Sequence, residues 1–304
     1  MNDSDTKYYS TISKEPIVGA ISASAAFLIW GFSPIYFKIL RVVPAFEILM
    51  HRVIWSFVLL LPLILISGQW NEFKTVIKSY RTMIILTVST ILVAANWFLF
   101  IWAINNNQIL QTSLGYYINP LVNVLLGMVF LKERLNPAKS VAVIIAGLGV
   151  LYLTVHYGKL PWISLTLAVT FAFYGLIRKV APVNALVGLT VETMILSLPA
   201  LGYLIYLDTA GMGSIFRMSV RIDILLICTV FVTAPPLLLF TIGARKIHLV
   251  TLGILQYIAP SCTFLLAVFI YNEPFTSIQV GTFGMIWFAL IIYSIDSVRE
   301  YRKR

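Results

Sequence analysis

Charged side chains are scarce in this sequence of 304 residues, since Asp, Glu, Lys and Arg together make up 11% of it and hydrophobic residues make up 60%. A soluble globular domain carries about 25% charged residues, so this composition excludes an ordinary soluble protein. Acidic residues are the scarcer class, with 12 against 22 basic ones. The balance predicts an integral membrane protein.

Cysteine and catalytic motifs are also scarce. The two cysteines, Cys228 and Cys262, both lie in apolar stretches and are expected to be small buried hydrophobes. No HExxH metal motif occurs, and "HYGKLP" lacks the glycine spacing and the Ser or Thr of a phosphate loop. We therefore expect no metal, no cofactor and no enzymatic activity.

Long apolar runs are abundant in the sequence. Windows of about 20 apolar residues recur along it, and each is long enough to cross a bilayer as a helix. We expect ten spans, with a polar tail at 1–16 and a basic tail at 296–304. The expected spans are 17–37, 45–66, 82–103, 109–131, 138–155, 160–177, 185–207, 222–243, 248–271 and 278–295.

Basic residues near span ends predict the orientation, because Lys and Arg are held on the cytoplasmic face. With both termini cytoplasmic, the cytoplasmic tails and loops hold 16 basic residues, Arg178 among them, and the opposite loops hold five. The net charge of +10 follows from this asymmetry. We therefore expect the lipid bilayer, and no nucleic acid, as the partner of the basic residues.

A repeat divides the chain. Shifted by 140 residues, "LGYYINPLVNVLLGMVFLKE" (114–133) falls on "ILQYIAPSCTFLLAVFIYNE" (254–273), and six of the 20 positions are identical. The loop "LKERLNPAK" carries three basic residues, while its counterpart "YNEPFTS" carries none. An odd number of spans per half inverts the second copy, so we expect two inverted five-helix repeats, at 17–155 and 160–295.

Prolines fall near the middle of two matching spans, at Pro120 and Pro260. A proline inside a helix cannot donate its amide hydrogen bond, so each is expected to break its helix and free the carbonyl of Tyr116 or Gln256. Lipid does not tolerate a free carbonyl, so this depth is expected to face a polar cavity between the repeats.

Polar side chains gather at the same depth and are the candidate substrate contacts. They are Tyr116, Tyr117, Asn119, Asn123, Gln256 and Tyr257. Trp30, Asn96 and Trp97 lie deep enough in their spans to join them. The alternative is that these groups hold neighbouring helices together and bind nothing.

Ionisable residues within spans form a second candidate set, because charge in hydrocarbon is costly and marks a pathway or an ion pair. Glu47 is close enough to a span end to reach the interface, and His51 lies one turn further on the same face. Arg52 and Glu192 form either a structural pair or a charged feature of the cavity. His51 and Glu192 are the candidates for proton coupling.

Several segments resemble one family closely: "WGFSPIYFKIL" (30–40), "PAFEILMHRVIWS" (44–56), "NWFLFIWAINNNQILQTSLGYYINPLVNVLLGMVFLKERL" (96–135), "LPWISLTLAVTFAFYGLIRK" (160–179) and "GLTVETMILSLPAL" (188–201). They resemble the ten-helix EamA-type transporters of the drug/metabolite transporter superfamily, in the RarD branch. The resemblance implies an all-α, multi-pass carrier of the bacterial inner membrane that works by alternating access, with a central cavity.

The function expected is secondary transport of a small polar or amphipathic metabolite, or of a drug-like compound. Export is the expected direction, proton coupling stays open, and the protein is either a monomer or a homodimer. A passive channel and a non-transporting membrane scaffold are the rivals. An intramembrane enzyme is disfavoured by the missing motifs.

The inverted topology makes a direct prediction for the loops that follow Glu133 and Glu273. Cysteines introduced at Asn136 and at Ser277, in a background without the native thiols, should show opposite accessibility to an impermeant thiol reagent applied to intact cells. Equal labelling of the two positions would contradict the inverted repeat.

Overall fold

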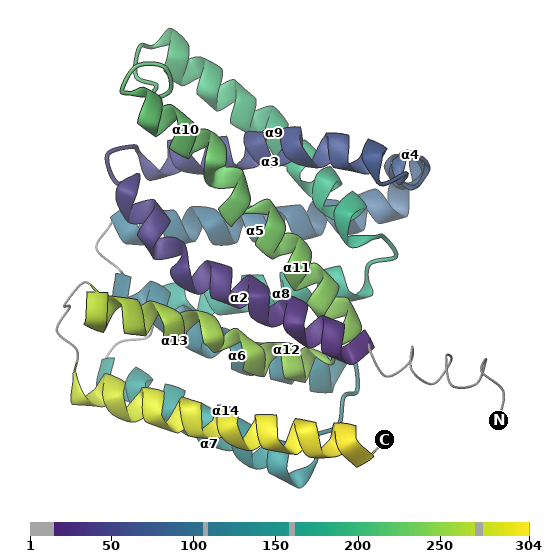
Figure 1. The fold of residues 1–304 in the computed structure, drawn as a ribbon, viewed down its shortest axis with the longest axis vertical. Coiled ribbons are helices and arrows are strands. Elements are labelled where there is room, and N and C mark those ends of the chain that lie inside the picture. Colours follow the sequence, from purple (N-terminus) through teal and green to yellow (C-terminus); the bar gives the residue numbers. More distant parts are fainter. Residues whose placement is uncertain (1–14, 106–108, 158–161, 271–275, 304) are drawn as a thin grey trace.

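The computed structural model describes residues 15–105, 109–157, 162–270 and 276–303, and all regular secondary structure in these ranges is helical (Figure 1). The helices are α2 (Glu15–Ile39), α3 (Ala45–Ile66), α4 (Trp70–Lys78), α5 (Tyr80–Asn105), α6 (Ile109–Phe130), α7 (Pro137–Tyr157), α8 (Trp162–Val180), α9 (Ala185–Thr209), α10 (Val220–Cys228), η1 (Thr229–Val232), α11 (Ala234–Lys246), α12 (Leu249–Gln256), α13 (Ile258–Leu265), η2 (Leu266–Ile270) and α14 (Ser277–Lys303).

Seven helical stretches of the described chain are long and apolar enough to cross a membrane, one of them formed by α10, η1 and α11 together. The fourth, ninth and tenth expected spans contain shorter apolar helices, at Gly115–Phe130, Leu249–Leu265 and Val280–Asp296. The chain is thus a multi-pass, all-α membrane protein, and the count of ten spans stays a prediction.

Helix α4 was not expected, because the sequence there predicted only a connector between spans. Its nine residues are too few to cross a bilayer, and they bury Phe73 and Val76 on one side only. These two side chains pack with Ile64 of α3 and Val187 of α9, and Trp70 stacks on Phe73 with 5.2 Å between ring centroids. The connector is therefore an amphipathic helix attached to the end of the bundle.

The break expected at Pro120 is not present, since α6 runs unbroken through this residue. A proline removes a single amide donor, and the helix on either side of it keeps its remaining hydrogen bonds. The matching span is interrupted at Tyr257, between α12 and α13, three residues before Pro260. There the Tyr257 amide bonds to the carbonyl of Ile254, at 3.2 Å, in the tighter pattern of a 3₁₀ turn.

Figure 1 shows the helices stacked as a flat bundle, with α7 and α14 paired along one edge and α3, α9 and α10 at the opposite edge. Helices α2, α5, α6, α8, α11 and α12 fill the space between them. The main apolar core belongs to this middle region and includes Phe27, Tyr174 and Phe240. A second core joins α6, α7, α12 and α14, so the paired edge helices pack onto the middle layer through α6 and α12.

Polar contacts show that the helices in two of the close pairs run antiparallel. Glu133, just after the end of α6, accepts hydrogen bonds from the amides of Leu249 and Val250 at the start of α12, at 2.7 and 2.9 Å. Asn136, just before α7, donates to Asp296 near the end of α14, at 2.6 Å. Each contact joins the end of one helix to the beginning of its partner.

The Glu133 carboxylate lies at the N-terminus of α12, where the helix dipole stabilises a negative charge. Burial alone would raise its pKa, but hydrogen bonds from His248 and from the amides of Val250 and Leu249 outweigh burial and lower the pKa below its ordinary value. The group therefore stays ionised, and the stability that it contributes is lost only as the pH falls through this lowered pKa.

Helices α6 and α12 approach one another closely at Gly253. A Cβ atom on Gly253 would lie 2.6 Å from the carbonyl oxygen of Pro120 and 3.0 Å from Cβ of Asn123. The first of these is a backbone atom that cannot rotate away. The absence of a side chain at residue 253 is therefore what permits this helix crossing.

We expect Gly253→Ala to destabilise the folded protein by about 1–3 kcal/mol, because the added methyl must push the two backbones apart. Gly284→Ala in α14 is the matched control, since nothing lies within 4 Å of a Cβ at that position. Melting temperatures of the two variants in the same detergent measure the difference. Equal melting temperatures would show that the crossing is not tightly packed.

Candidate functional site

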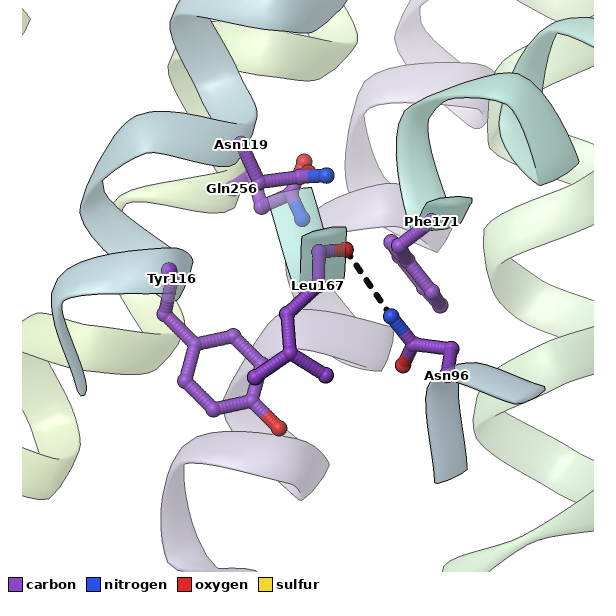
Figure 2. Close-up of a pocket in the computed structure, with 7 residues that line it drawn as sticks. Asn96, Tyr116, Asn119, Leu167, Phe171 and Gln256 are labelled. Carbon is purple, nitrogen blue, oxygen red and sulfur yellow. Dashed lines mark hydrogen bonds between the residues drawn. The ribbon is translucent and has the colours of Figure 1, made fainter. Parts of the chain in front are cut away.

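A small cavity of about 10 Å³ lies where α5, α6, α8 and α12 meet (Figure 2). This is room for about one water molecule. Its lining combines three amide side chains with aromatic and apolar groups. The lining residues are Asn96, Gly115, Tyr116, Asn119, Leu167, Phe171 and Gln256.

Asn96 brings α5 into the site and is buried. Its amide nitrogen donates to the carbonyl oxygen of Leu167 at 2.8 Å, drawn as a dashed line in Figure 2, and to the hydroxyl of Thr170 at 2.9 Å. Both acceptors belong to α8. The hydroxyl of Thr170 also donates to the Thr166 carbonyl, at 2.7 Å.

A row of amides connects α8, α6 and α12. Asn119 donates to the carbonyl of Ala168 at 2.5 Å, and Asn123 donates both to Oδ1 of Asn119 at 3.2 Å and to Oε1 of Gln256 at 2.7 Å. Oδ1 of Asn123 is buried without a hydrogen-bond partner among the described residues. Asn119 and Gln256 line the cavity and Asn123 does not, and a Cβ on Gly175 of α8 would lie 3.9 Å from the unused oxygen. The row therefore retains one unused acceptor, of the kind that a ligand or a water satisfies.

The three tyrosine candidates nearest the two prolines separate into two groups. Tyr116 lines the cavity, is 45% exposed and contacts the edge of Phe100. Tyr117 and Tyr257 are buried away from it, in the core shared with α7 and α14. There the Tyr257 hydroxyl donates to the Tyr117 carbonyl at 3.2 Å, so these two side chains join helices.

Trp30 and Trp97 lie around the cavity without lining it. Trp30 packs edge-on against Phe171, one of the lining residues, with 5.8 Å between centroids. Its other ring neighbours, Phe27 and Phe240, belong to the main core. The Trp97 ring faces the guanidinium of Arg52 at 5.1 Å.

The ion pair considered between Arg52 and Glu192 is not formed. Nε of Arg52 donates to the hydroxyl of Thr233 at 2.9 Å, whereas Glu192 lies 3.7 Å from Nε of Arg178. Arg178 had been counted among the loop residues, but it lies in the last turn of α8 and is 0% exposed. The connection from α8 to α9 is short, so the partner of Glu192 comes from the adjacent helix.

Glu192 is 2% exposed and is held by two hydroxyl groups as well as by Arg178. Ser89 of α5 and Tyr174 of α8 both donate to its carboxylate, the second at 3.4 Å. Gly188 leaves the space for the guanidinium, since a Cβ there would lie 2.0 Å from Nη1 of Arg178. This buried charged cluster lies between α5, α8 and α9.

Glu47 and His51 share one face of α3, as their spacing predicted, with 3.9 Å between Nε2 of His51 and the carboxylate. The prediction that Glu47 reaches the membrane interface was wrong, because its side chain is 1% exposed. It accepts hydrogen bonds from the amide and hydroxyl of Ser214, at 2.6 and 2.9 Å. Nε2 of His51 is buried and has no hydrogen-bond partner within the described chain.

Sequence reasoning missed the residues that lie beside the predicted ones: Ser89, Phe171, Tyr174, Arg178 and Thr233. Arg178 was missed because it sits at the end of an apolar run, where a basic residue ordinarily marks the membrane boundary. The signal that would have found it is Gly188, a small residue in the facing helix opposite a long side chain. Within the described ranges, no group of three or more His, Cys, Asp or Glu is placed to hold a metal ion.

Comparisons with known proteins give the family. The model of the EamA-like transporter family matches residues 17–155. The chain is 46% identical to an "Uncharacterized transporter" of Vibrio cholerae, covering 92% of this chain and 93% of the relative. It is 45% identical to "Protein RarD" of Escherichia coli, covering 95% and 98%.

More distant comparisons agree. "Chloramphenicol-sensitive protein RarD" of Pseudomonas aeruginosa is 29% identical, over 94% of this chain and 96% of the relative. A crystal structure with 16% identity shares the fold, with a TM-score of 0.68 over 91% of this chain and 97% of the other. The match to Protein RarD extends over both halves of the chain at 45% identity, and the chain belongs to the EamA-like transporter family, in its RarD branch.

Proposed function

We propose that this protein is a secondary active transporter that exports a small polar or amphipathic metabolite, or a drug-like compound, across the bacterial inner membrane. The observation that carries the proposal is the buried row of amides from Asn119 through Asn123 to Gln256, in which Asn119 and Gln256 line the cavity and Asn123 keeps an unused acceptor. Buried amides in hydrocarbon are costly unless they are bonded, so a retained free acceptor favours a ligand. The relatives named as transporters point the same way.

The architecture proposed is ten helices in two inverted repeats of five. Helix α6 packs against α8 as α2 packs against α12 and α13, and α5 packs against α8 as α2 packs against α11. Each contact in one half therefore has a counterpart between the equivalent helices when the two halves are exchanged by the 140-residue shift. The antiparallel pairs α6 with α12 and α7 with α14 join equivalent helices, as a twofold axis in the membrane plane requires.

Orientation and motion follow from this architecture. The start of α2 and the end of α14 lie on the same side of the bundle (Figure 1), which supports termini on one face, and the basic residues favour the cytoplasmic face. Alternating access then amounts to rocking of one half against the other about the shared site. The cavity is small in this arrangement, so passage requires the helices around it to separate.

Proton coupling is proposed through Glu192, with His51 as the second candidate. The Glu192 carboxylate neutralises the buried guanidinium of Arg178, so a proton that binds Glu192 must release Arg178 from its partner. A pair of buried groups whose attraction depends on one proton is a means of coupling protonation to helix position.

The transport proposal is tested by counterflow in proteoliposomes, with cargo identified first by thermal shift against a metabolite panel. Gln256→Met removes a cavity amide without loss of volume, and we expect affinity to fall by about tenfold, since a hydrogen bond contributes about 1 kcal/mol and more where a partner is left unpaired. Asn71→Leu, which removes an exposed amide on α4, is the control. Unsaturable flux would indicate a channel, and absent flux with bound cargo a scaffold.

Coupling is tested by Glu192→Gln, which leaves a buried guanidinium unpaired and costs about 3–5 kcal/mol. The double variant Arg178→Gln with Glu192→Gln removes both charges and should recover the melting temperature. If the carboxylate couples protons, the double variant should still exchange cargo but should not respond to a pH gradient. A full response to the gradient in the double variant would rule out Glu192 as the coupling site.

A further inference from the structure

Arg52 is held in α3 by two aromatic rings and one hydroxyl. The guanidinium lies 5.2 Å from the centroid of Phe37 in α2 and 5.1 Å from that of Trp97 in α5. Nε donates to Thr233 at 2.9 Å. These contacts come from two helices and from the turn between η1 and α11, and they leave the planar group with a fixed direction, since an arginine stacked on rings keeps its fork pre-organised.

No carboxylate of the described residues compensates the charge of Arg52. None of the ion pairs formed within the described ranges includes Arg52, and the bond from Nε is its one hydrogen bond to a residue there. Arg178, the other arginine at depth, has Glu192 at 3.7 Å. An arginine stays charged, and a charge in hydrocarbon is held by a partner or faces a polar cavity. Arg52 therefore has two terminal NH₂ groups with no acceptor in this part of the protein.

The uncompensated charge lies beside the cavity. Tyr116 lines the cavity and interacts electrostatically with the guanidinium of Arg52. Trp97, which stacks on Arg52, follows directly after Asn96, another lining residue. Arg52 is partly buried, and neither of its terminal nitrogens is among the fully buried polar atoms that lack a partner. Tyr116 thus adjoins both the amides that line the cavity and the charge of Arg52.

We propose that the cargo carries a carboxylate, and that Arg52 binds it through its two terminal NH₂ groups. This inference rests on the transport function proposed above and names the chemical class of its cargo. A guanidinium fork matches a carboxylate with two parallel hydrogen bonds. A phosphate carries about two negative charges at neutral pH and calls for more than one cation, and a cationic cargo is repelled.

The aromatic rings and amides near Arg52 indicate the chemistry of the rest of the cargo, beyond its carboxylate. Phe37 and Trp97 surround the guanidinium with apolar surface, while Asn96 and Gln256 present hydrogen-bonding groups in the lining of the cavity. An amphipathic organic acid, with a carboxylate and a separate polar or aromatic part, uses both regions at once. The neutral amide of the same acid keeps the shape and loses the charge.

In the test, phenylacetate, phenylacetamide and inorganic phosphate are each added at millimolar concentration to the full-length protein in detergent. Binding of phenylacetate is compared with binding of the other two compounds. Melting temperature and tryptophan fluorescence are recorded for the native protein and for Arg52→Gln, Arg52→Lys and Arg217→Gln. We expect phenylacetate to stabilise the native protein and to change the emission of Trp97, with an affinity about tenfold above that of the amide, a difference of about 1.4 kcal/mol.

Arg52→Gln should remove this preference, and Arg52→Lys should keep the preference with weaker binding, because lysine keeps the charge without the fork. Arg217→Gln, which alters an exposed arginine paired with Asp208, should keep it unchanged. If Arg52→Gln fails to fold, Arg52→Lys tests the inference alone. Weaker binding of phenylacetate with the preference over phenylacetamide retained would then support it.

Several results would overturn the inference: equal binding of acid and amide, no binding of phenylacetate, binding of phosphate alone, or an unchanged preference in Arg52→Gln. Counterflow separates this failure from failure of the transport proposal. Saturable counterflow of a neutral or cationic cargo, unaffected by phenylacetate, would leave the transporter intact and remove the carboxylate from its substrate class.

Discussion

A polar group within this bundle has to find its hydrogen-bond partner in the protein or in a ligand, because hydrocarbon offers none. The structure meets this constraint with side chains that bond to the backbone of a neighbouring helix. Asn96 bonds to Leu167, Asn119 to Ala168, and Lys179 to the carbonyl of Ala244, at 2.8 Å. Each bond joins two helices, so the polar residues that a soluble protein places on its surface here determine which helices are neighbours.

The same constraint makes the exceptions informative. Oδ1 of Asn123 and Nε2 of His51 are two of the eight buried side-chain atoms that have no hydrogen-bond partner in the described chain, and Arg52 carries a charge without a counter-ion there. Each such group calls for an explanation, and a ligand, a proton or a second conformation supplies one. The transport proposal and the carboxylate inference both start from groups of this kind.

The sequence predicted the helical membrane fold and the family correctly, because composition, length of apolar runs and motifs do not depend on tertiary detail. Asn96, Tyr116, Asn119 and Gln256 were among its candidate substrate contacts, and these four line one cavity. Tyr117 and Tyr257 were candidates as well, and the structure buries them in the core shared with α7 and α14 instead. Adjacent residues on a helix point about 100° apart. The sequence therefore predicts how deep in the membrane a residue lies, but it does not predict which neighbouring helix its side chain points toward.

The charged residues show the second limit. Arg52 and Glu192 were paired by comparing heights in the membrane, but pairing requires that the helices be neighbours. Glu192 instead uses Arg178, from the helix that immediately precedes its own. Helix neighbourhood is set by packing of small residues and amides over the whole bundle, and no local pattern in the sequence carries it.

The crossing at Gly253 has a mechanical consequence. Pro120 lies near the middle of α6, so the contact divides that helix into two arms of roughly 16 Å each at 1.5 Å per residue. If α6 tilts about this contact, as the proposed alternating access requires, its two ends move in opposite directions relative to α12, and a gap opens at one membrane face as the other narrows. Because the crossing lies near the middle of α6, the two ends would then be displaced by similar distances.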